Sequence, residues 1–156
     1  MQNRAKIFAK SLEKQVMQWK RNGEMVLITM VPGDKLKESI LQAAKEAGVE
    51  AAEVSGLGAV RKVDIGLAKA DFSGYDVTHF EEAWELVSLV GNISTLEGEP
   101  FLHAHAALGG VGGQMKGGHL IEAEIAVTAE IFLHPLPESI KRGPSSHFDG
   151  IKVWNL

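Results

Sequence analysis

The sequence predicts an α+β domain with a largely antiparallel or mixed sheet and few helices. Near residue 40, apolar residues recur at helical spacing, whereas most later apolar segments are short and end at turn residues. A length of 156 residues suits a single domain, since domains commonly contain about 100–200 residues. We find no internal repeat and no linker that would divide the chain further.

The first segment, residues 4–20, is expected to form a helix with one apolar stripe. The stripe consists of Phe8, Leu12, Val16 and Trp19. Residues 1–21 contain six basic residues and one acidic residue, so they carry a charge of about +5. The formal net charge of the chain is −4, which leaves about −9 on the remainder. We therefore expect a basic helical extension at 1–22 and a domain at 23–156.

Two interpretations of the basic extension remain open. A helix packed on the domain with a charged, solvated outer face is the ordinary case. Alternatively, the extension is an arm for an acidic partner, either DNA or a protein. The acidic remainder argues against nucleic-acid binding by the domain itself. Since the N-terminus has no apolar signal region and no run long enough to span a membrane, we expect a cytoplasmic protein without membrane contact.

The segment 24–48 predicts a strand followed by a helix. Residues 24–31 are apolar and end at Pro32-Gly33-Asp34, and residues 35–47 have helical periodicity. Asp34 is expected to be the N-cap, because its carboxylate can accept a free backbone N–H of the first turn. Gly48 is expected to end the helix as a C-terminal cap.

The rest of the chain predicts short strands. They are expected at 49–55, 59–70, 75–80, 86–90, 101–108, 119–133 and 151–154. Gly56-Leu57-Gly58 is expected to separate the first two of these strands, and Gly91-Asn92 to end the fourth.

The chain has no cysteine and six histidines, so disulfides and cysteine-ligated metal sites are excluded. His103 and His105 are two residues apart, which places both on one face of a strand. If the strands flanking the following glycine-rich loop form an antiparallel hairpin centred on Gly112, His105 lies opposite His119. Directly opposed residues share a face, so the three imidazoles would converge.

Three convergent imidazoles predict a site for a divalent metal ion. Zinc is the first expectation, since three histidines and a water form a known open zinc site. Iron(II), manganese, nickel and copper also accept imidazole ligands. A fourth protein ligand is not evident; the candidates are Glu97, Glu99 and Glu130. The alternative is a set of hydrogen-bonded strand histidines without a metal, which is also the interpretation of His79.

Several motifs, taken together, are similar to a known family. They are Pro32-Gly33-Asp34, Gly56-Leu57-Gly58-Ala59-Val60, Glu85–Ile93, Leu102-His103-Ala104-His105, Gly117-Gly118-His119-Leu120 and Thr128-Ala129-Glu130. In this order they resemble the PPC domain, the plants and prokaryotes conserved domain, over roughly residues 24–156. The resemblance implies an α+β fold assembled as a homotrimer. It also implies that His103, His105 and His119 correspond to the family's histidine cluster, which can hold a metal in prokaryotic members.

Three functions follow as alternatives. The first is a trimeric, metal-binding PPC protein with a regulatory or DNA-associated role. Members of the family are often described as DNA-binding, but the resemblance supports this role only weakly here. The chain lacks the Arg-Gly-Arg-Pro hook that grips DNA in plant members, so only the basic N-terminal helix could contact DNA. The second is a metal-dependent hydrolase or lyase, with Glu97, Glu99 or Glu130 as general base. The third is a closed metal site that only stiffens the hairpin.

Overall fold

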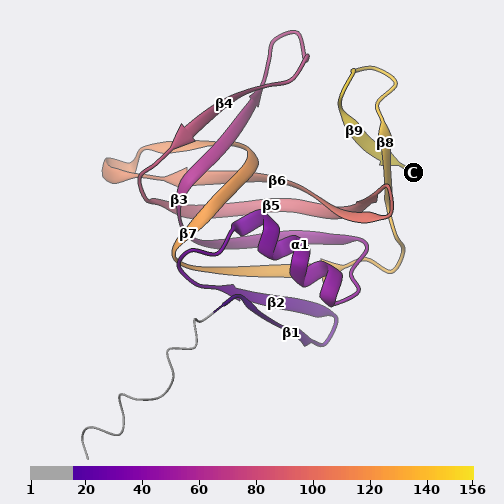
Figure 1. Ribbon diagram of the computed structural model, residues 1–156, viewed down its shortest axis with the longest axis horizontal. Helices are drawn as coiled ribbons and strands as arrows, with labels where there is room; N and C mark the ends of the chain where they lie inside the picture. The colour runs from indigo at the N-terminus through magenta and orange to yellow at the C-terminus, as the bar shows by residue number, and fades with distance from the viewer. Residues whose placement is uncertain (1–15) are drawn as a thin grey trace, which may run out of the picture.

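The structure, a computed structural model, describes residues 16–156. Over this range one helix accompanies a nine-stranded mixed sheet, which agrees with the expected α+β class (Figure 1). The elements are β1 (Gln18–Asn22), β2 (Met25–Met30), α1 (Leu36–Glu46), β3 (Ala52–Ala68), β4 (Tyr75–Phe80), β5 (Trp84–Leu96), β6 (Glu99–Gly109), a 3₁₀ turn η1 (Val111–Gly113), β7 (Met115–Pro135), β8 (Lys141–Pro144) and β9 (Lys152–Asn155).

Strand β7 connects the different parts of the sheet. It pairs antiparallel with β2, with β3 and, through its first residues, with β6. Strand β5 pairs with both β3 and β6, so the strands β3, β5, β6 and β7 form a closed cycle in which each pairs with the next. Strand β4 is added to β3, and β8 is joined to β5 by a parallel pair, Thr95 and Lys141.

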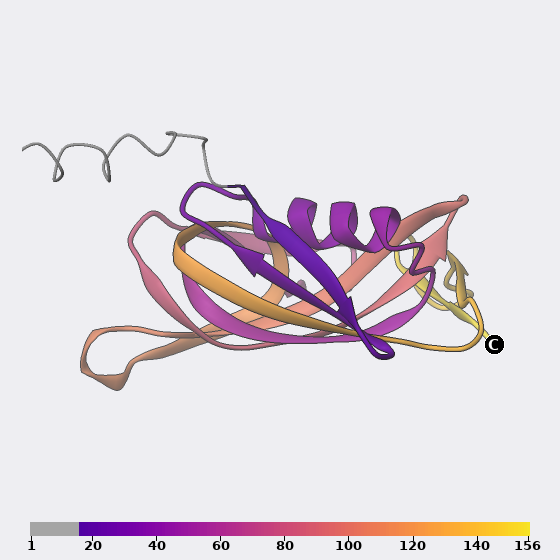
Figure 2. The same ribbon diagram turned by 90° about the horizontal axis from the view of Figure 1, so that it is seen from below.

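Helix α1 packs along one face of the sheet (Figure 2). Its buried apolar residues, Leu36, Ile40, Ala43 and Ala44, recur at helical spacing, as the sequence predicts. Burying a leucine or isoleucine side chain is worth about 1.5–3 kcal/mol, so this stripe holds the helix against the sheet. In the part of the chain described, no helix has the length and apolar character needed to cross a membrane.

The expected N-cap of α1 is wrong. Asp34 accepts a hydrogen bond from Val31 N instead, and Lys35 occupies the N-cap position without a side-chain cap. The carboxylate of Glu122 on β7 accepts hydrogen bonds from the backbone N–H groups of Lys37 (2.8 Å) and Glu38 (3.3 Å). The acceptor for the free N–H groups is therefore tertiary, and a cap from a residue so distant in the chain leaves no local sequence signal.

The C-terminus of α1 follows the sequence expectation. Gly48 has a φ of 68°, and its N–H donates to Lys45 O. The N–H of Val49 donates to Ala44 O at 2.8 Å. These two bonds form a Schellman motif, in which a glycine takes the left-handed conformation just past the helix.

The predicted helix over residues 4–20 is wrong where it can be compared, because Gln18–Asn22 form strand β1. A two-residue loop, beginning with Gly23 at a φ of 60°, turns the chain into β2, and the backbone groups pair there. Trp19, assigned to the helical stripe, donates from its indole N–H to Glu46 on α1 at 2.7 Å. The rest of the expected helical extension, residues 1–15, lies outside the described residues.

Two glycine segments expected to interrupt strands lie inside them. Strand β3 continues through Gly56–Gly58 with a bulge, and β5 continues through Gly91. A Cβ atom at Gly91 would overlap with the carbonyl oxygen of His103 on β6. The glycine thus permits two strands to approach closely and does not mark a turn. The strand at 75–80 is confirmed at its bounds, and β8 was not predicted.

Replacing Glu122 with alanine should lower the free energy of unfolding by about 1–2 kcal/mol, the usual cost of losing a helix-capping acceptor. Urea denaturation of the full chain measures this difference. The matched control is Glu53→Ala, which removes an exposed carboxylate from β3. Equal losses in the two variants would show that Glu122 does not cap α1.

Candidate metal centre

The hairpin register expected from the sequence is confirmed. Strands β6 and β7 pair antiparallel, and His105 lies directly opposite His119. The connecting turn contains Gly112 and Gly113 with φ values of 72° and 78°, which only glycine adopts readily. His103 lies two residues before His105 on β6, so its side chain emerges on the same face.

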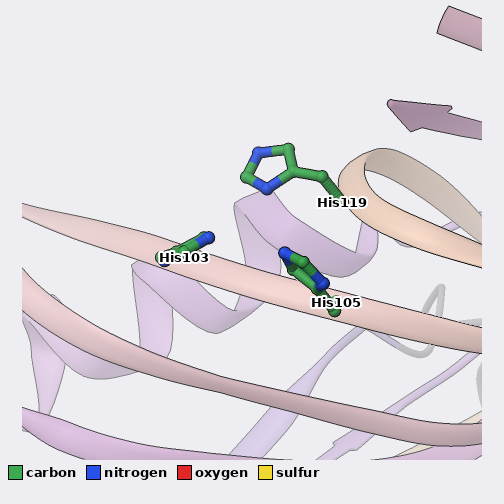
Figure 3. A group of neighbouring side chains, drawn as sticks. All are labelled: His103, His105 and His119. Atoms are coloured by element: carbon green, nitrogen blue, oxygen red, sulfur yellow. The ribbon is translucent and has the colours of Figure 1, made fainter. Parts of the chain in front are cut away.

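The three imidazole rings converge on one point (Figure 3). The ring centroids are 5.4 Å apart for His103 and His105, 5.2 Å for His103 and His119, and 5.6 Å for His105 and His119. One nitrogen from each ring can be chosen so that all three lie within 4.8 Å of one another. Each ring can therefore offer one lone pair to a shared ion.

The electrostatics of the cluster favour the neutral forms of His119 and His103. Partial burial lowers the pKa of His119 to about 4, with smaller effects from the charges of His103, His105 and Lys37. Burial, and then the charge of Arg142, also lowers the pKa of His103. A neutral imidazole has a free lone pair, so both rings are in the form that binds a metal at neutral pH.

His119 carries an unsatisfied group. Its Nδ1 atom is buried and has no hydrogen-bond partner among the described residues. The ring stacks on Tyr75 of β4 at 4.9 Å between centroids and 15° between planes, which fixes its orientation. A buried imidazole nitrogen without a partner is costly, and three imidazole nitrogens at this spacing are a suitable donor set for a divalent ion. The residues present fit such an ion.

The acids considered as further ligands do not join the histidines. Glu99 forms an ion pair with Lys45 at 2.7 Å, and Glu97 lies in the turn between β5 and β6. Glu130 lies on β7 opposite Thr29 and Leu57. Within residues 16–156, the histidine group contains no carboxylate, so its candidate ligand atoms are all imidazole nitrogens.

Arg142 of β8 lies beside the cluster and was not found from the sequence. Its Nη2 is 3.5 Å from His103 Nδ1 and donates to Asn92 Oδ1 at 2.8 Å. The guanidinium also donates to Ser94 Oγ and to the carbonyl of Lys152. Asn92 is the partner of His103 in the pairing of β5 with β6. Because these groups come from four separate strands, β5, β6, β8 and β9, no local motif in the sequence indicates that they meet.

The remaining histidines lie away from this group. His79 Nδ1 is 2.7 Å from Asp64 and its Nε2 is 3.1 Å from Glu81, and these bonds, the one to Glu81 foremost, raise its pKa. The expected structural role of His79 is compatible with these two partners. His134 lies exposed on β7 and His147 in the loop between β8 and β9.

Comparison with models of protein families shows to which family the chain belongs. The model of the Plants and Prokaryotes Conserved (PCC) domain matches residues 17–137. The chain belongs to this family. The predicted resemblance is therefore confirmed, and the match includes Gln18–Asn22, which were expected to lie in the extension. A search of curated proteins found no match.

Solved structures share the fold of this PCC chain. A plant- and prokaryote-conserved protein from Pyrococcus horikoshii is 32% identical, with a TM-score of 0.78 over 90% of this chain and 95% of that chain. A metal-containing protein from Archaeoglobus fulgidus is 30% identical, with a TM-score of 0.78 over 91% and 99%. A candidate DNA-binding protein from Bacteroides thetaiotaomicron has a TM-score of 0.84 over 90% and 98%, at 22% identity.

The titration of His119 should make the stability of the metal-free protein depend on pH. Its pKa is about 4 in the folded protein against an ordinary 6.5, so the unfolded chain takes up the proton first as the pH falls. The contribution is complete above about pH 6.5 and is lost between there and pH 4.

Urea denaturation at several pH values in the presence of a chelator measures this effect. His119→Gln should remove this part of the pH dependence, whereas the control His134→Gln should keep it. An unchanged pH profile in His119→Gln would contradict the assignment.

Proposed function

We propose that this PCC protein binds a divalent metal ion through His103, His105 and His119. The observation that carries the proposal is the convergence of three imidazoles on one sheet face, with one nitrogen of each within 4.8 Å of the others. A relative at 30% identity that is described as metal-containing supports it.

Zinc is the metal we propose first. It binds imidazole nitrogen well and imposes no strong geometric preference of its own. Three protein ligands are the number found in open zinc sites, where the remaining position is left for water or another small ligand. When bound there, the ion would supply a Lewis acid that polarises an oxygen or lowers the pKa of a bound water. In the single chain His105 is exposed, whereas His103 and His119 are partly buried.

We further propose that the chain acts as a homotrimer. Apolar side chains are exposed on the sheet face that carries His105. Val90 is opposite His105, Phe132 is opposite Ser55 in the same row, and Leu57 follows on β3. Their exposed fractions are 57%, 40% and 52%. Contact with further copies of the chain would remove this apolar surface from water.

A DNA-associated regulatory role is proposed for the basic residues 1–21, the last of which lie within the family match, and not for the acidic remainder of the chain. Residues 1–21 carry six of the 16 basic residues of the chain, whereas the remainder is acidic. A trimer would carry three such segments, which would raise the avidity for one DNA molecule if they faced one way. The candidate DNA-binding neighbour supports the fold alone, because its identity is 22%.

A metal-dependent enzyme of the hydrolase or lyase type is the second candidate. It is favoured by the absence of a carboxylate from the histidine group within residues 16–156, which leaves the site open and the charge of an ion uncompensated. A purely structural ion would be better served by a closed set of ligands.

Native mass spectrometry of the untagged protein, with elemental analysis, should show a trimer carrying one metal ion per chain. His105→Ala should lose most of the metal, because two imidazoles bind a divalent ion much more weakly than three. The control His134→Ala removes an exposed histidine from β7 and should keep the metal.

Full metal content in His105→Ala would contradict the metal site. A monomeric mass would contradict the homotrimer. The same pair of variants separates the enzyme from the binding protein. A hydrolase or lyase activity that survives His105→Ala would not depend on the metal site.

The basic segment should make DNA binding dependent on salt. Replacing Arg4, Lys6, Lys10 and Lys14 with glutamine in the full chain should weaken binding and flatten the salt dependence, by roughly 0.9 in the log–log slope for each phosphate that is no longer neutralised. The control carries four glutamines at other basic positions, Lys45, Lys69, Lys116 and Lys141. Equal binding by both variants, measured by fluorescence anisotropy, would remove DNA from the proposal.

A further inference from the structure

The guanidinium of Arg142 carries a positive charge that no acidic residue balances within residues 16–156. Its three short hydrogen bonds end on neutral oxygens, which belong to Ser94 Oγ (2.7 Å), Asn92 Oδ1 (2.8 Å) and the carbonyl of Lys152 (2.9 Å). No ion pair of the described residues includes it. A half-buried charge is ordinarily paired, because removing it from water is costly.

The charge is held in place beside the histidine cluster. Asn92 and Ser94 of β5 are the pairing partners of His103 and Phe101 on β6, so their hydrogen bonds fix the guanidinium next to β6. The rings of Phe101 and Trp154 lie 5.2 Å and 5.8 Å from the guanidinium carbon. Several contacts together thus hold Arg142 in this position. Its Nη2 lies 3.5 Å from His103 Nδ1.

The surroundings of the cluster are therefore cationic. Histidines that bind zinc commonly donate their second N–H to a carboxylate, which balances part of the metal charge. Here Arg142 lies beside His103, with its Nη2 3.5 Å from Nδ1, and the charge of Lys37 on α1 makes a smaller contribution at His119. A divalent ion bound by the three imidazoles would add two more positive charges, and within residues 16–156 the histidine group includes no carboxylate to balance them.

We propose that the three-histidine site binds a small oxyanion, a carboxylate or a phosphate, together with its metal ion, and that Arg142 supplies the positive charge that favours it. The inference rests on the proposed function, because the metal is part of the site. An arginine has five N–H groups, and the three neutral oxygens use three of them. Hydrogen bonds from a guanidinium to a carboxylate or phosphate are charge-assisted and are stronger than hydrogen bonds between neutral groups.

A consequence of this arrangement is that metal and anion bind cooperatively. Without an anion, Arg142 repels the ion and lowers its affinity. With an anion present, the repulsion is replaced by attraction to both cations. Coupling of this kind is reciprocal, so the anion raises the affinity for the metal as much as the metal raises the affinity for the anion.

The test measures the zinc affinity of the full-length protein by competition with a chelator that fixes free zinc. Three buffers of equal ionic strength contain chloride, acetate or inorganic phosphate. We expect zinc to bind about tenfold more tightly in acetate or phosphate than in chloride, within the usual range of such coupling. An effect of acetate alone identifies a carboxylate site, and an effect of phosphate alone identifies a phosphate site.

Three variants assign the effect to the charge. Arg142→Met should lose the anion dependence and bind zinc in chloride at least as tightly as the natural chain. A merely structural role of Arg142 would instead weaken zinc binding in every buffer. Arg142→Lys keeps the charge and should keep part of the anion effect. The control Lys45→Met removes an exposed cation from α1 that is paired with Glu99, and should change nothing.

The outcomes separate the two proposals. Failure of the natural chain to bind zinc in any buffer would overturn the metal site and this inference with it. Zinc binding of equal affinity in all three buffers would overturn the oxyanion site and leave the metal site standing. If Arg142→Met does not fold, as judged by circular dichroism, Lys37→Met takes its place and should reduce the anion effect.

Discussion

The register between β6 and β7 is the constraint on which the histidine cluster depends. With His105 opposite His119, the rings share one face, whereas a shift of one residue would turn His119 to the other face. The register is not set by the hairpin alone, because β7 is also paired with β2 and β3 along its length. Strand β6 is held on its other side by β5, because Gly91 has no side chain and lets the two strands lie close together. The position of three side chains is thus secured by most of the sheet.

The parts predicted well are those encoded by neighbours in sequence. The spacing of His103 and His105 and the glycine-rich turn before His119 are local, and they sufficed for the cluster and its register. Gly48 ended α1 as expected, because a C-terminal cap needs only a glycine at one position. The order of motifs was sufficient for the family, and the model match over residues 17–137 confirms it.

The parts predicted wrongly are those in which distant residues decide. Trp19 fits a helical stripe, yet its strand is fixed by pairing with β2 and by a hydrogen bond to Glu46. Glu122 caps a helix 84 or more positions earlier in the chain. Local sequence predicts turns at Gly56, Gly58 and Gly91, whereas in the structure these glycines allow close contact between strands. Sequence patterns report local conformational preference, whereas the conformation at these positions is decided by contacts with residues distant in the chain.

The hairpin of β8 and β9 follows residue 137, where the match to the family model ends. The three histidines lie within the matched range, and Arg142 lies beyond it. The histidine cluster and the neighbouring charge are therefore encoded in separable stretches of the chain. An exchange of the C-terminal hairpin alone would alter the chemical surroundings of the histidines without changing any of them, which makes this hairpin a natural point at which proteins that share the same three histidines can diverge.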